Sequence, residues 1–123
     1  MGNANVIQIT YGSREHTGTE LSCTLTGVTI QQVASSAFFC YVNVNNFWYA
    51  LPGNITSSHS YRTFTRSTGS PQFYINRLTG SGTQTFQSTR ILMIPANDLR
   101  TGRKAAVDFN DYEAVKKFYN LPD

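Results

Sequence analysis

The chain has 123 residues, of which only 14% are charged, and ten basic against seven acidic side chains give a net charge of +3. A chain of this length is typical of one domain that buries about two thirds of its unfolded surface. The basic residues are dispersed and do not form the dense stripe of a nucleic-acid-binding protein. No segment approaches the roughly 20 consecutive apolar residues of a membrane-spanning helix. We therefore expect one domain, residues 1–123, that binds no nucleic acid.

Uncharged polar residues are abundant in this sequence, above all Ser, Thr, Asn, Gln and Gly. This composition is typical of an all-β protein with many loops, and it favours an extracellular or envelope protein over a cytosolic enzyme. The chain also contains eight Phe, seven Tyr and one Trp. Because each aromatic side chain buries a large area, these residues are sufficient for collapse and exclude a disordered chain.

In the first third of the chain, alternating apolar and polar residues predict strands at 5–11 and 19–30, with a polar loop at 14–18 between them. Gly27 interrupts the second strand. It predicts a bulge or bend, after which the apolar residues continue on the opposite face. A short connection at 31–35 leads to the next segment.

Residues 36–51 are the most aromatic part of the chain and predict its central hairpin. Two segments rich in aromatic and β-branched residues flank Asn45 and Asn46, two residues that tolerate positive φ. The aromatic residues of this hairpin are expected to contribute more buried area than any other segment.

Further strands are predicted at 60–66, 72–79 and 83–94. The last of these becomes continuously apolar from Ile91 to Ile94, a pattern typical of a strand buried on both sides. With turn residues between them, about seven or eight strands predict an antiparallel β-sandwich or jelly-roll-like fold.

The C-terminal segment predicts a short helix at about 111–119, with Asn110 as N-cap and Glu113 as its third residue. Apolar and aromatic side chains then recur at helical spacing on one side. Because so short a helix is marginal on its own, we expect it to pack against the sheets. A helix that binds a partner protein is the alternative interpretation.

No pattern of residues indicates catalysis. The chain has no G-x-S-x-G motif, and His16 and His59 lack metal-ligand spacing to each other and to either cysteine. We therefore expect no enzyme, no metal and no cofactor; a small hydrolase that uses one of the histidines with a nearby acid is the lesser alternative. Cys23 and Cys40 fit either a disulfide or two buried thiols.

Exposed aromatic rings on a β-sandwich are typical of carbohydrate-binding modules, in which they stack on sugar faces beside amide or guanidinium donors. Trp48 and Tyr49 are neighbours in a strand, so they point to opposite faces. Together with Tyr61 and Tyr74 they are the candidate ligand-binding residues. The alternatives are that these rings fill the core, lie under the helix or form a subunit contact.

Short motifs at the two ends of the chain resemble the C-terminal globular heads of bacterial envelope proteins, often lipoproteins, that carry a collagen-like stalk. In that family a G-x-A-N-V opening follows the stalk and a D-Y-x-x-V helix closes the head. Here Gly2, Ala4, Asn5 and Val6 match the opening, and the closing motif matches at Asp111, Tyr112 and Val115.

The resemblance implies a non-enzymatic, surface-exposed head domain for assembly, adhesion or ligand recognition at the cell envelope. A collagen-like stalk implies a homotrimer, because its Gly at every third residue packs three chains around one axis. We expect a domain excised from a longer protein, without its targeting segment and attached to a membrane only through a lipid anchor absent from this sequence. A glycan or a surface protein is the expected ligand.

Overall fold

The computed structural model of the chain describes residues 6–17, 20–56, 59–65, 70–95, 109–119 and 121. Within these residues there are ten strands and two helices. The strands are β1 (Ile7–Tyr11), β2 (Arg14–His16), β3 (Glu20–Thr24), β4 (Ser36–Val44), β5 (Phe47–Leu51), β6 (Gly53–Thr56), β7 (His59–Thr65), β8 (Gln72–Thr79), β9 (Gln84–Phe86) and β10 (Ser88–Pro95), and the helices are α1 (Ile30–Ala34) and α3 (Tyr112–Tyr119).

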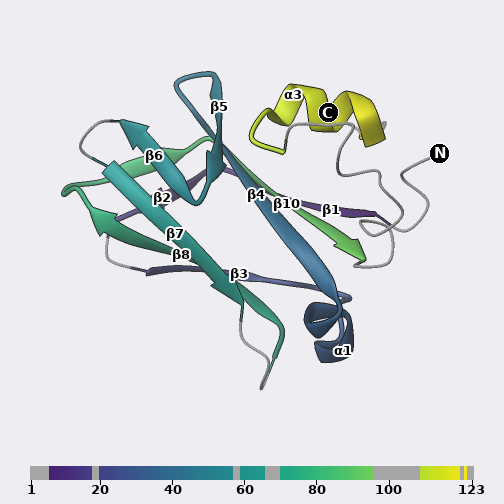
Figure 1. The fold of residues 1–123 in the computed structure, drawn as a ribbon. Coiled ribbons are helices and arrows are strands. Elements are labelled where there is room, and N and C mark those ends of the chain that lie inside the picture. Colours follow the sequence, from purple (N-terminus) through teal and green to yellow (C-terminus); the bar gives the residue numbers. More distant parts are fainter. Residues whose placement is uncertain are drawn as a thin grey trace.

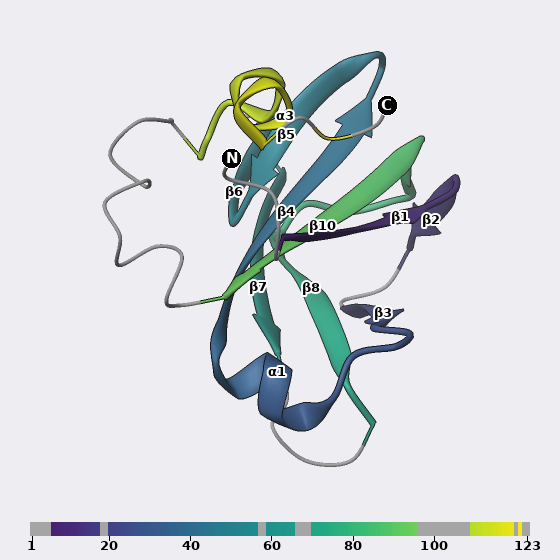
Figure 2. The same cartoon turned by 90° about the vertical axis from the view of Figure 1, so that its right-hand side faces the viewer.

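Two antiparallel four-stranded sheets form the body of the protein. Their strand orders are β1-β10-β4-β5 and β3-β8-β7-β6, and a two-stranded ladder of β2 and β9 accompanies them. The short helix α3 lies beside the β4–β5 hairpin, and α1 lies at the far end of β4 (Figures 1 and 2). The predicted all-β, sandwich-like fold with a short C-terminal helix is confirmed.

The apolar side chains form two cores, one on each side of the β1-β10-β4-β5 sheet. Strand β10 contributes to both, because its side chains alternate between the two faces. Ile91 and Met93 pack between the two sheets, whereas Leu92 and Ile94 pack under α3. All four are at most 2% exposed. The prediction that this segment is buried on both sides is therefore confirmed.

The central hairpin forms as predicted. Val44 pairs with Phe47, which leaves a two-residue turn, and Asn45 and Asn46 have φ values of 53° and 69°. Positive φ at both turn positions is the geometry of a type I′ turn, whose twist matches that of the flanking strands. The backbone N–H of Asn46 donates to Oε1 of Gln87 at 3.1 Å, which ties the tip of the hairpin to the start of β10.

The expected polar loop at 14–18 and the expected continuous strand at 83–94 are both wrong in detail. Residues 14–16 form β2, and the second segment divides at Gln87 into β9 and β10. The β1–β10 ladder thereby bends and continues as β2–β9, which brings His16 and Phe86 next to Tyr61 of the opposite sheet, with ring centroids 5.3 and 5.7 Å from the Tyr61 ring. These aromatic contacts between the two sheets stabilise the protein at the point where the ladder of backbone hydrogen bonds is interrupted.

The expected strand at 19–30 is also too long, because β3 ends at Thr24 and α1 begins at Ile30. Thr29 starts this helix: its hydroxyl accepts from the N–H of Gln32 at 3.1 Å, while Oε1 of Gln32 accepts from the N–H of Thr29 at 2.9 Å. This capping box gives the backbone N–H groups of Thr29 and Gln32 side-chain acceptors. In a strand, such groups would donate to a neighbouring strand of the sheet. Gly27, with φ of 79°, belongs to the turn before it.

Candidate ligand-binding site

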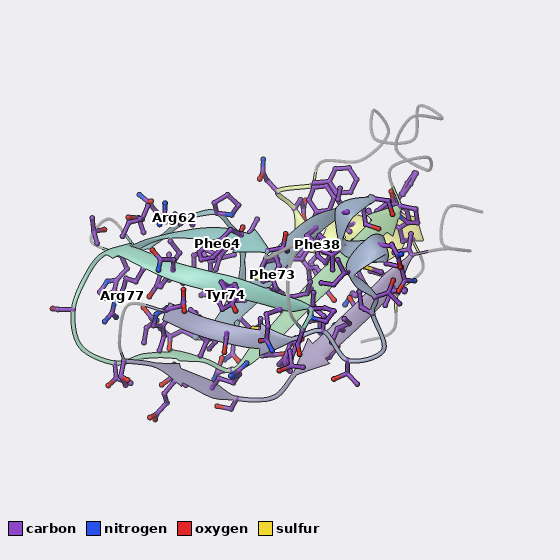
Figure 3. All side chains as sticks on the ribbon, turned by 90° about the horizontal axis from the view of Figure 1, so that it is seen from below. Phe38, Arg62, Phe64, Phe73, Tyr74 and Arg77 are labelled. Atoms are coloured by element: carbon purple, nitrogen blue, oxygen red, sulfur yellow. The ribbon has the colours of Figure 1, made fainter. Side chains whose placement is uncertain are left out.

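The four aromatic residues predicted to bind a ligand lie in three different places in the protein. Tyr61, 2% exposed, is part of the core between the sheets, and Tyr49 packs against the same core. Tyr74 lies on the outer face of the β3-β8-β7-β6 sheet, where its ring stacks on Phe64 at 5.0 Å (Figure 3). Trp48 points out of the other sheet, toward α3. The four rings therefore do not form one platform.

Trp48 lines a cavity of about 350 Å³ that we call the hairpin–helix pocket. It is bounded by residues 46–48 at the tip of the β4–β5 hairpin and by residues 110–113 at the start of α3. In both views of the ribbon, these two elements lie next to each other (Figures 1 and 2). The volume is at the small end of the about 300–1,000 Å³ found for small-molecule sites, so a ligand of monosaccharide size matches it.

Aromatic and cationic contacts fix the Trp48 ring at this site. Its centroid lies 4.5 Å from that of Tyr112, and the guanidinium carbon of Arg90 lies 5.1 Å from Trp48 and 5.6 Å from Tyr112. A guanidinium at this distance is attracted by the ring quadrupoles. Trp48 is half-buried, so the ring is held in place while part of it stays accessible.

Hydrogen bonds attach α3 to the sheet directly below the pocket. Nη1 of Arg90 donates to the hydroxyl of Tyr112 at 2.5 Å, and that hydroxyl donates to Oε1 of Gln8 at 2.9 Å. Tyr112 is only 3% exposed. Because β1, β10 and α3 meet in this network, the base of the pocket is formed before any ligand binds.

The N-cap of α3 is Asp111, one residue later than predicted. Oδ1 of Asp111 accepts from the N–H of Ala114 at 3.2 Å, so Asp111 and not Asn110 is the N-cap. The hydroxyl of Tyr41 donates to the carbonyl of Phe109 at 2.7 Å and holds the preceding residues on the sheet. Asp111 is exposed, and its second carboxylate oxygen makes no hydrogen bond to a described residue.

The polar side chains around the pocket are amides and carboxylates. Asn46 and Asn110 supply amides, and Asp111 and Glu113 supply carboxylates. Lys116 forms an ion pair with Glu113 at 3.4 Å, although Glu113 is 63% exposed and the pair is accordingly weak. Amides and carboxylates around an aromatic ring suit a ligand that has several hydroxyl groups on an apolar ring.

The residues of the catalytic alternative lie away from the pocket. His16 is 1% exposed and contacts the rings of Tyr61 and Phe86. His59 lies beside the turn after β8, where its Nε2 is 3.2 Å from the carbonyl oxygen of Ser81. The described residues contain no cluster of three or more His, Cys, Asp or Glu side chains that could hold a metal ion.

Both cysteines are free thiols in the inter-sheet core. Burial raises the pKa of each thiol, and in Cys23 the nearby Arg14 guanidinium opposes this, with Nη1 3.5 Å from Sγ. Such thiols are poor nucleophiles and poor metal ligands at neutral pH. In the described part of the chain, no helix is long and apolar enough to cross a bilayer.

Of the residues that line the pocket, the sequence predicts only Trp48 as a ligand-binding candidate. The sequence patterns indicate a turn at Asn46 and a helix start at Asn110 and Asp111, without indicating a pocket. The available signal was an amphipathic helix that had to pack near the aromatic hairpin, but the sequence did not say which end of the helix meets which end of the hairpin.

Compared with known proteins, the chain matches no protein-family model, no curated protein and no solved structure.

Proposed function

We propose that this protein is a non-enzymatic recognition domain that binds a saccharide in the hairpin–helix pocket. The observation that carries the proposal is the position of Trp48, a half-buried ring held by Arg90 and Tyr112 in a cavity bordered by side-chain amides and carboxylates. The apolar face of a pyranose stacks on such a ring, and its hydroxyls bond to the surrounding polar groups. Of the functions predicted from sequence, this supports ligand recognition by a carbohydrate-binding domain.

The charges at the pocket favour an uncharged sugar. Asp111 and Glu113 both line it, and neutral hydroxyls donate to carboxylates in charge-assisted hydrogen bonds. At about 0.3 kcal/mol for each of the about 12 non-hydrogen atoms of a hexose, binding amounts to about 4 kcal/mol, or a dissociation constant of about 1 mM. Affinity of this order suits adhesion through many copies of a domain.

The sequence motifs support a proposal about where this protein acts. We propose a surface-exposed head domain at the cell envelope that forms a homotrimer, supported by the uncharged polar composition and by the resemblance to stalk-bearing heads. Asp111 and Tyr112 of the closing motif have structural roles at the pocket, as N-cap and as anchor of α3. Gly2, Ala4 and Asn5 of the opening motif lie outside the described residues.

Intrinsic fluorescence tests the proposal, because Trp48 is the one tryptophan in the chain. Titration with neutral hexoses, N-acetylhexosamines and soluble polysaccharides is expected to change the emission saturably for at least one sugar class. Asp111→Asn keeps a good N-cap residue and removes the charge, so it should weaken binding by about fivefold to tenfold.

The matched control is Glu20→Gln, which removes an exposed carboxylate from β3 in the other sheet and should leave the affinity unchanged. Unchanged emission with every sugar, together with no binding on a glycan array, would contradict the proposed function.

A further inference from the structure

A second cavity, of about 230 Å³, adjoins the hairpin–helix pocket. Residues 38–41 of β4, residues 50–52 at the end of β5 and residues 109–110 before α3 line it. We call it the apolar notch. Among the residues that the structure describes, none that lines it is charged, and its walls include Phe39 and Phe109, whose rings stack at 4.2 Å with an angle of 12° between their planes.

The two cavities lie along the same strand and share a wall. Trp48 of the pocket and Ala50 of the notch are alternate residues of β5, so they point to the same face and lie roughly 7 Å apart. Residues 109–113 run opposite them, and Asn110 lines both cavities. A ligand that extends beyond the pocket along β5 therefore enters the notch.

The notch exists because β5 is shorter than β4. Leu51 is the last residue of β5 to pair with β4, opposite Cys40, and the chain then continues into β6 of the other sheet. Phe38 and Phe39 are paired with β10 on one side and have no β5 partner on the other. The opening is thus a fixed feature of the sheet edge, formed where the chain passes from one sheet to the other.

We propose that the apolar notch is a second subsite, which receives an apolar substituent of the ligand whose saccharide lies in the hairpin–helix pocket. The ligand class is then a glycoside or glycoconjugate with an aromatic or alkyl group attached directly to the sugar. This inference rests on the proposed function, because the group in the notch is attached to the sugar that lies in the adjoining pocket. An unsubstituted sugar fills only the first of the two cavities.

Paired glycosides distinguish the two subsites. Calorimetric titrations of the whole chain with the methyl and phenyl glycosides of glucose, galactose, mannose and N-acetylglucosamine compare the same sugar with and without an apolar group. We expect the phenyl member of the preferred pair to bind about tenfold more tightly, since a buried phenyl ring removes substantial apolar area from water. Ala50→Leu places a larger side chain in the notch, so this variant should bind the phenyl and methyl glycosides with about equal affinity.

A second measurement uses the native protein, so its result does not depend on whether a variant folds. In the native protein, intermolecular nuclear Overhauser effects from the phenyl protons should reach the rings of Phe39 and Phe109. Equal affinity for the methyl and phenyl glycosides, or phenyl contacts elsewhere, would overturn the second subsite and leave the saccharide site intact. If no glycoside of either kind binds, the proposed function fails and the second subsite fails with it.

Discussion

Removal of one hydroxyl group should measure how firmly α3 is attached to the sheet. In Tyr112→Phe the ring that contacts Trp48 remains, while the oxygen between Arg90 and Gln8 is lost. Both partners then lose a hydrogen bond at a site where the tyrosine is only 3% exposed. Water has little access to replace it there.

The expected loss follows from the type of bond. A hydrogen bond to a charged group contributes about 1.5–3 kcal/mol to stability, and Arg90 is charged. We therefore expect the free energy of unfolding to fall by about 2 kcal/mol, which for a chain of this length lowers the melting temperature by about 8 °C.

Thermal and urea unfolding monitored by circular dichroism measure this change. Tyr49→Phe is the matched control, because the Tyr49 side chain is half-buried and its hydroxyl makes no hydrogen bond to a described residue. This control should change stability by less than about 0.5 kcal/mol. Equal stabilities for the two variants would refute the role assigned to the Arg90–Tyr112–Gln8 network.

Three further predictions concern other parts of the molecule. Gly80→Ala should destabilise the protein by about 1–3 kcal/mol, because Gly80 has φ of 108° and a Cβ there would lie 2.4 Å from Cδ2 of His59; Gly12→Ala, with open space around the added carbon, is the control in the same unfolding assay. Burial raises the pKa of Cys40 well above its usual 9.0 and also raises that of Tyr11, so the folded protein keeps protons that the unfolded chain releases and the free energy of unfolding should fall as pH rises above about 9. Urea unfolding between about pH 7 and pH 10 measures this change, and a constant free energy of unfolding would contradict it. In Cys40→Ala, the free energy of unfolding should fall less steeply with pH. Light scattering over a concentration series should give the mass of a trimer, and a monomer at every concentration would refute the assembly.

Local sequence patterns predict much of the fold, because whether a residue is apolar or polar reflects whether its position is buried. The continuous apolar segment of β10, the paired asparagines of the β4–β5 turn and the apolar stripe of α3 each reflect a requirement within a few residues. The β4–β5 turn and α3 lie where the patterns predict them, apart from a one-residue shift of the N-cap to Asp111, whereas the strand predicted at 83–94 divides into β9 and β10.

Elements that depend on distant residues could not be predicted in this way. The bend that separates β2 from β1 and β9 from β10 is favoured by the contact of His16 and Phe86 with Tyr61, which joins three separate segments. The start of α1 has a local signal, Thr29 followed by Gln32, but the alternation of apolar residues in the same segment predicts a strand. The pocket likewise joins residues more than sixty positions apart, so the sequence predicts only Trp48 among the residues that line it.

Mapping of backbone and indole N–H resonances during a saccharide titration tests the central claim most directly. A sugar that binds as proposed should shift the Trp48 indole signal and the backbone signals of residues 46–48 and 110–113, with little change on β7 and β8. Shifts centred on Phe64 and Tyr74, on the outer face of the other sheet, or no shifts with any neutral sugar, would contradict the saccharide site.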